Sequence, residues 1–257
     1  MMQVDNYFYY FKGALSEEDC QKIINLGDNK ISENKQKGED VSGTTFGFNH
    51  KQEDETKEAH SDATIEDRVK ETGKSPAEIV KSSYIRDSEI SWLTDDWIYD
   101  LIKPYINRAN RDAGWRYQYD TFENFQYTTY NPGGFYNWHA DGGSCHHSMF
   151  KKFIPGITPT DKNGRMPKHY TNNNNWVGKI RKISLTINLN KPGEYEGGNL
   201  KFDFGPHAER ERYYECVEMR PQGSIILFPS WLEHQVTPIT KGVRKSLVLW
   251  CLGRPFK

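Results

Sequence analysis

The chain has 257 residues, of which 14% are aromatic and 27% charged, and its formal net charge is −1. This length is sufficient to bury a hydrophobic core without disulfide or metal cross-links. The near-neutral balance provides no overall electrostatic field that would attract nucleic acid or an anionic membrane. We therefore expect neither as a partner, and the composition leaves the oligomeric state open.

Cysteine usage and hydropathy predict the compartment. The four cysteines are far apart and form no CxxC pair, which is typical of free thiols in a reducing environment. Residues 1–13 contain an early acid and no long apolar run, which argues against a signal peptide. No segment approaches the length of apolar chain that spans a bilayer. The sequence predicts a soluble, cytoplasmic protein.

The N-terminal part begins with a strand and a helix. Residues 4–11 are rich in strand-forming aromatics. Ser16 is followed by acidic residues up to Asp19, a pattern that resembles a capping box and predicts a short helix with Gly27 near its end. Residues 28–82 are charged in both signs and poor in large apolar side chains, so we expect a polar surface excursion.

Two further helix starts precede the strands. Ser75 lies within the polar excursion and is followed by proline and glutamate at favourable helix positions. Thr94 precedes apolar residues at spacings of three and four, which predicts an amphipathic helix that ends at Gly114.

The rest of the chain has the pattern of short strands punctuated by glycine and proline. They are expected at residues 122–130, 183–189, 199–204, 213–219, 224–228, 234–239 and 246–252. Residues 145–179 form a long polar insertion, typical of a lid, a binding loop or disorder. The pattern predicts an α+β, mainly β fold in one domain over 1–257, with a helical part at 1–115 and a β core at 116–257.

A histidine and an aspartate two residues apart suggest a metal site. If they lie in or at the end of a strand, His139 and Asp141 point to the same face. This pair alone fits a hydrogen-bonded polar turn better than a metal site, because an Fe(II) facial triad needs a third ligand. His234 is the best candidate, since it re-enters a strand after a buried strand and a proline turn. Arg244 begins another apolar strand, where its planar guanidinium would match a carboxylate.

The ordered HxD…H…R pattern and its surroundings resemble a known family. Residues 195–200 read YEGGNL, residues 221–238 match PxGxxxxFPSxxxHxVxP, and residues 85–93 resemble an RxS…WL segment. Together these features resemble the prolyl 4-hydroxylase-like branch of the Fe(II)/2-oxoglutarate-dependent dioxygenases. The likeness runs from about residue 7 to the C-terminus, apart from the two polar insertions. It implies a double-stranded β-helix (jelly-roll) core with N-terminal helices packed on one sheet.

The resemblance also implies roles for individual residues. His139, Asp141 and His234 would hold Fe(II), and Arg244 would bind the distal carboxylate of 2-oxoglutarate. The other positions expected in the co-substrate pocket are Tyr130, Thr186, Asn188 and Trp250. Some relatives carry a tyrosine where Asn188 stands.

The activity that the resemblance implies is hydroxylation of an unactivated C–H bond, most simply in a prolyl residue of a peptide or protein. O2 and 2-oxoglutarate would be co-substrates, succinate and CO2 co-products, and ascorbate the reductant. The alternatives are a non-catalytic binding module on the same fold and a hydroxylase of another residue or of a small molecule. A cupin-like enzyme that uses the triad without 2-oxoglutarate is disfavoured by Arg244.

The start of the second insertion contains a cluster of metal-binding residue types. Cys145, His146 and His147 are adjacent, but no fourth ligand follows at a spacing typical of zinc sites. We expect a polar loop near the mouth of the site, where substrate choice would be decided.

Overall fold

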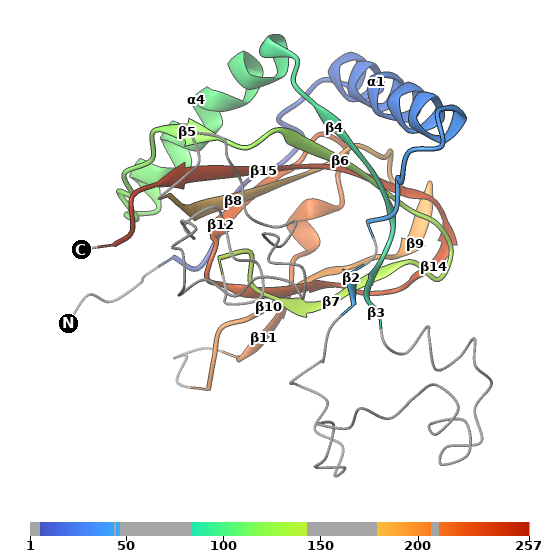
Figure 1. Cartoon of the computed structure of the whole chain (residues 1–257). Helices are drawn as coiled ribbons and strands as arrows, with labels where there is room; N and C mark the ends of the chain where they lie inside the picture. Colours follow the sequence, from blue (N-terminus) through green and yellow to red (C-terminus); the bar gives the residue numbers. More distant parts are fainter. Residues whose placement is uncertain (1–5, 44, 47–83, 143–178, 207–210, 257) are drawn as a thin grey trace, which may run out of the picture.

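The computed structural model describes residues 6–43, 45–46, 84–142, 179–206 and 211–256 (Figure 1). The expected helix start at Ser75 and the Cys145–His147 cluster lie outside these residues. In the described part the protein is mostly β, with two long helices. None of the described helices is long and apolar enough to cross a membrane.

The larger sheet is antiparallel and carries the longest strands. Its order is β1 (Tyr9–Phe11), β12 (Ile225–Pro229), β8 (Ile180–Asn188), β15 (Arg244–Gly253), β6 (Phe125–Tyr130) and β4 (Glu89–Leu93), and β5 (Thr121–Phe122) pairs with β15.

The smaller sheet faces the larger one (Figure 1). Its order is β11 (Tyr213–Glu215), β10 (Leu200–Asp203), β13 (Glu233–Val236), β7 (Phe135–His139), β3 (Tyr84–Asp87) and β2 (Thr45–Phe46). A two-stranded sheet of β9 (Tyr195–Gly197) and β14 (Ile239–Gly242) lies at one end of the molecule.

Helices α1 (Glu17–Gln36) and α4 (Asp96–Asp112) cover the outer face of the larger sheet (Figure 1). Their apolar stripes and one face of the sheet form the main hydrophobic cluster, which includes the fully buried residues Ile23, Ile98, Ile102, Ile106, Ile183, Leu185 and Ile187. The alternation predicted for residues 183–189 is therefore confirmed: its apolar face packs under the helices, and its polar face turns toward the smaller sheet.

Helix α1 begins as predicted and ends later than predicted. The Ser16 hydroxyl accepts a hydrogen bond from the Asp19 backbone N–H at 3.0 Å, which confirms the N-cap. The helix does not end near Gly27 but continues to Gln36, so the predicted end was wrong. Gly27 is buried against Tyr127, and a Cβ there would lie 2.3 Å from the aromatic ring. This glycine serves close packing rather than termination.

The other boundaries also differ in detail. Asp95 rather than Thr94 is the N-cap of α4, whereas Gly114 follows the helix with φ +76°, as a helix-ending glycine should. The strand expected at 213–219 divides into β11 and a 3-10 turn at Val217–Met219. The strand pattern missed β3 and β4.

Candidate metal and co-substrate site

The three expected metal ligands lie together on the inner side of the smaller sheet. His139 ends β7 and is the Cα partner of His234 on β13, and Asp141 follows β7 directly. The Asp141 carboxylate lies 3.7 Å from Nε2 of each histidine, through a different oxygen for each. One ligand atom from each residue lies within 4.8 Å of the others, a spacing at which a metal ion can be held.

Backbone carbonyls orient both imidazole rings. Nδ1 of His139 lies 2.7 Å from the Asn137 carbonyl oxygen, and Nδ1 of His234 lies 3.0 Å from that of Leu232. A carbonyl oxygen only accepts hydrogen bonds, so the proton of each neutral ring belongs on Nδ1. The Nε2 lone pairs of both rings are therefore available to a metal, and the carbonyls fix the ring angles.

Asp141 is buried and ionised. Burial opposes the charged form, but His234 and His139 when they are protonated, the Arg181 guanidinium and a hydrogen bond from Ser184 hold the pKa of Asp141 well below its usual range. The two imidazoles and the carboxylate form the donor set that suits divalent iron with open coordination positions.

A buried ion pair lies beside this carboxylate, and the sequence pattern did not reveal it. Arg181 donates two hydrogen bonds to Glu123, at 2.6 and 2.7 Å, and only 11% and 2% of the two side chains is exposed. The guanidinium also lies 3.8 Å from the ring centroid of Trp250. The bidentate pair and the ring fix Arg181 where its charge acts on Asp141.

A cavity between the two sheets extends from the triad to Arg244. Its lining comprises Arg86, Gln126, Tyr130, Tyr136, His139, Asp141, Leu185, Thr186, Leu200, Phe228, His234, Val236, Arg244, Ser246, Val248 and Trp250. Strands of the larger sheet supply the Arg244 side of the cavity, and strands of the smaller sheet supply the histidines. Residues far apart in the chain therefore line the same cavity.

Arg244 is a buried cation whose ion-pair partner is missing within the described residues. It is 1% exposed, and its partners there are the Ser246 hydroxyl at 3.3 Å and the Met219 sulfur at 3.6 Å. Its Nε has no hydrogen-bond acceptor in the described part of the chain, and its guanidinium lies 5.4 Å from the ring centroid of Tyr130. An uncompensated buried charge is costly, so this geometry favours an anionic ligand.

The remaining predicted pocket residues divide into two groups. Tyr130, Thr186 and Trp250 line the cavity, and the buried Nε1 of Trp250 has no acceptor among the described residues. Asn188 is not among the lining residues. Its amide donates to the carbonyl oxygens of Asn190 at 3.2 Å and Arg220 at 3.0 Å, so it connects loops at the end of the sheet.

A second buried arginine lines the same cavity and was missed as a site residue. Arg86 is 7% exposed and donates to Ser88 and Gln126 at 2.8 Å and to Thr128 at 3.1 Å. Its guanidinium lies 4.8 Å from the ring centroid of Tyr136. The RxS motif in the sequence was the available signal, but the burial of Arg86 depends on how β3 pairs with β7.

Comparison with known proteins finds oxygenases and hydroxylases among the relatives of this chain. Residues 125–252 match the family model described as the 2OG-Fe(II) oxygenase superfamily. A PKHD-type hydroxylase of Synechococcus sp. is 38% identical over 68 residues, which is 26% of this chain and 27% of that protein. A PKHD-type hydroxylase of Picosynechococcus sp. is 33% identical over 107 residues, or 42% of each chain. The chain thus spans less than half the length of these relatives.

Solved structures share the fold at low sequence identity. The viral collagen prolyl hydroxylase of Paramecium bursaria Chlorella virus-1, solved with 2OG, has a TM-score of 0.52 at 18% identity, covering 97% of both chains. A prolyl hydroxylase of Trichoplax adhaerens, solved with a hypoxia inducible factor peptide fragment, has a TM-score of 0.53 at 14% identity, covering 96% of this chain and 84% of that one. By its family match the chain belongs to the 2OG-Fe(II) oxygenase superfamily, and it shares its fold with these two prolyl hydroxylases.

Proposed function

We propose that this chain is an Fe(II)- and 2-oxoglutarate-dependent dioxygenase that hydroxylates an unactivated C–H bond. The substrate that we propose is a prolyl residue of a peptide or protein. Succinate and CO2 are the co-products, and ascorbate serves as reductant. The two facing sheets form a double-stranded β-helix, and 1–257 acts as one domain.

The observation that carries this proposal is the position of Arg244. Its guanidinium is buried in the cavity that the triad lines, and no residue that the structure describes supplies an acceptor for its Nε. A dicarboxylate fits this arrangement, because one carboxylate can pair with the planar guanidinium while the other end reaches toward the triad. The hydroxyls of Tyr130 and Thr186 and the Nε1 of Trp250 supply further polar contacts along the cavity wall.

His139, Asp141 and His234 would hold the iron. The ligand atoms of the two histidines and of Asp141, which is held as the anion, lie within 4.8 Å of one another and so can share one ion. When bound, iron with 2-oxoglutarate and O2 supplies the oxidising power, whereas the protein's own residues orient the substrate and exclude water. Three protein ligands leave positions open for the co-substrates.

The substrate class rests on family position and on the cavity. The solved neighbours include prolyl hydroxylases, one of them bound to a peptide fragment. Arg86 and Gln126 lie in the cavity with polar groups that can contact a peptide backbone. These features favour a prolyl residue over a free small molecule.

Substitution of Arg244 tests the proposal. The purified chain, supplied with Fe(II), ascorbate, 2-oxoglutarate and proline-rich peptides, should form succinate and a peptide heavier by one oxygen atom. Arg244→Met should raise the 2-oxoglutarate concentration needed by about 30-fold or more, because truncating one partner of a buried charge pair costs roughly 2–5 kcal/mol. Arg244→Lys should recover part of this loss, because it restores the charge without the two-point geometry.

Three results would contradict the proposal. An unchanged 2-oxoglutarate requirement in Arg244→Met would favour a metal enzyme that works without this co-substrate. Oxygen found on carbons other than those of proline would reject the substrate assignment and keep the reaction class. A protein that binds no iron and leaves 2-oxoglutarate unchanged would be a binding module on the same fold.

A further inference from the structure

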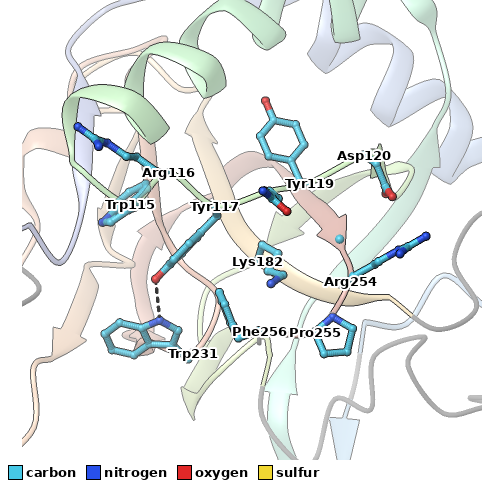
Figure 2. Close-up of a pocket in the computed structure, with 12 residues that line it drawn as sticks. Trp115, Arg116, Tyr117, Tyr119, Asp120, Lys182, Trp231, Arg254, Pro255 and Phe256 are labelled. Atoms are coloured by element: carbon cyan, nitrogen blue, oxygen red, sulfur yellow. Dashed lines mark hydrogen bonds between the residues drawn. The ribbon is translucent and has the colours of Figure 1, made fainter. Parts of the chain in front are cut away.

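A second hollow, distinct from the metal cavity, is lined by aromatic rings and cations (Figure 2). We call it the aromatic groove. It is bordered by the segment from Trp115 to Asp120, by Lys182 and Trp231, and by the segment from Gly253 to Phe256. Trp231 is 42% exposed and Phe256 54% exposed, so large apolar rings meet solvent here.

Hydrogen bonds and ring contacts hold the groove in shape. The Trp231 indole N–H donates to the Tyr117 hydroxyl at 3.2 Å (Figure 2). The Tyr117 ring lies 5.1 Å from that of Phe256 in an edge-on contact. The Asn110 side chain bonds both the N–H and the carbonyl of Tyr117, each at 2.9 Å. Because the Tyr117 hydroxyl accepts from Trp231, its own proton is available to a carbonyl oxygen of a ligand.

Lys182 brings a buried positive charge into this groove. Only 4% of the residue is exposed, its Nζ lies 3.4 Å from the Phe256 ring centroid, and no carboxylate pairs with it among the described residues. The register between β8 and β15 shifts at this point, from Ile183 opposite Cys251 to Arg181 opposite Leu252. Lys182 is the residue left out of the pairing, and such a bulge redirects a side chain.

The charge around the groove is positive. Arg116 and Arg254 line it as exposed cations, and within the described residues neither has an ion-pair partner. The acid among the lining residues, Asp120, is already paired with Lys179 at 2.7 Å. The groove therefore lacks negative charge to balance Lys182 and the two arginines.

Backbone hydrogen bonds connect the groove to the segment that carries the metal-ligand candidates. The Ser230 backbone N–H donates to the Lys182 carbonyl at 3.0 Å, and the Ser230 carbonyl accepts from Gly142 at 2.7 Å. Gly142 directly follows the metal-ligand candidate Asp141, and Trp231 directly follows Ser230. The backbone under the groove is therefore hydrogen-bonded to the segment that carries Asp141.

We propose that the aromatic groove binds an extended peptide segment with acidic side chains, on the polypeptide that presents its target residue to the metal cavity. Aromatic grooves with hydrogen-bond donors suit extended, proline-containing chains. Lys182 is a compact point charge on a buried stem and so fits a single carboxylate. The inference rests on the proposed function for the target residue, but not for binding itself.

The binding test uses the whole chain without iron or 2-oxoglutarate. The probe is a fluorescently labelled peptide of alternating proline and glutamate, followed by anisotropy. We expect it to bind, and matched peptides with glutamine or lysine in place of glutamate to bind at least about tenfold more weakly. Lys182→Met and Trp231→Ala should each weaken binding of the glutamate peptide about tenfold or more. Lys241→Met removes an exposed lysine elsewhere and should leave binding unchanged.

Other outcomes overturn the inference. Equal affinity in Lys182→Met, checked as folded by its thermal transition, would remove the groove cation from recognition. Tighter binding of a labelled thymidine oligonucleotide than of the glutamate peptide would make the groove a nucleic-acid site. Peptide binding without any 2-oxoglutarate turnover would reject the proposed function alone, whereas turnover without peptide binding would reject the groove proposal alone.

Discussion

His139 and His234 face each other across antiparallel strands β7 and β13, and the centres of their imidazole rings are 4.2 Å apart. The register shifts between His234 and Val236, so the pairing is irregular beside the rings. In a strand, a slip of one residue sends a side chain to the opposite face. The pairing of β7 with β13 thus decides whether the two rings and Asp141 can share an ion.

The first prediction concerns this arrangement. His234→Ala should weaken binding of Co(II), used as an air-stable substitute for Fe(II), by more than about 100-fold, because loss of an outer-shell partner alone costs 10–100-fold in metal affinity. Isothermal titration calorimetry measures the affinity. His60→Ala is the matched control, since His60 lies in the segment 28–82 that the sequence predicts to be a polar surface excursion, and it should bind Co(II) like the unaltered chain. Equal affinity in His234→Ala would exclude this histidine from the ligand set.

The second prediction concerns the ion pair beside the site. Glu123→Gln leaves Arg181 buried without its carboxylate, and breaking such a pair costs about 3–5 kcal/mol of unfolding free energy. Urea denaturation measures the loss. Glu196→Gln removes one partner of the exposed pair with Lys241 and should change stability by less than about 1 kcal/mol. A change of less than about 1 kcal/mol in both variants would show that the buried pair contributes no more to the free energy of unfolding than the exposed pair does.

The third prediction concerns the contact of α1 with the larger sheet. Gly27→Ala improves helix propensity by about 1 kcal/mol, but its Cβ would lie 2.3 Å from the buried ring of Tyr127. Overpacking of this kind typically costs about 1–3 kcal/mol, so we expect net destabilisation.

Asn29→Ala, on the exposed side of the same helix, separates the two effects. It should stabilise the protein slightly, because alanine has the higher helix propensity. Thermal unfolding of both variants gives the comparison. Stabilisation by Gly27→Ala would mean that the Tyr127 ring moves aside at little cost.

The fourth prediction concerns pH. Burial lowers the pKa of Lys182 below its ordinary value of 10.5, so the unfolded chain holds this proton more tightly than the folded chain. Folding stability then rises with pH between the folded and unfolded pKa values. Lys182→Met removes this dependence. The free energy of unfolding of the unaltered chain should therefore increase relative to that of Lys182→Met as the pH rises toward 10.5.

Urea denaturation near neutral pH and near 10.5 measures this difference. Lys241, which is 76% exposed, provides the control: Lys241→Met should show no comparable change with pH. A pH-independent difference between Lys182→Met and the unaltered chain would contradict the shifted pKa.

Much of the architecture could be predicted from local patterns. The period-two alternation at residues 183–189 and the three-and-four spacing after Thr94 report the buried faces of β8 and α4, because burial of one face requires that periodicity. The role of Gly27 was predicted wrongly because it depends on a contact with a residue distant in the sequence. A glycine within a helical pattern usually indicates the end of a helix. Here the close approach of the Tyr127 ring, which is far away in the sequence, explains why residue 27 is glycine.

The sequence by itself determined the family, the candidate metal ligands His139, Asp141 and His234, and the candidate carboxylate partner Arg244. These residues stand in motifs whose order and spacing can be recognised without a structure. Only the tertiary structure decided which other groups join them. Burial and strand register brought Arg86 into the cavity, left Asn188 outside it and turned Lys182 toward the aromatic groove. These outcomes depend on pairing between distant strands, and no local pattern encodes a cross-strand register.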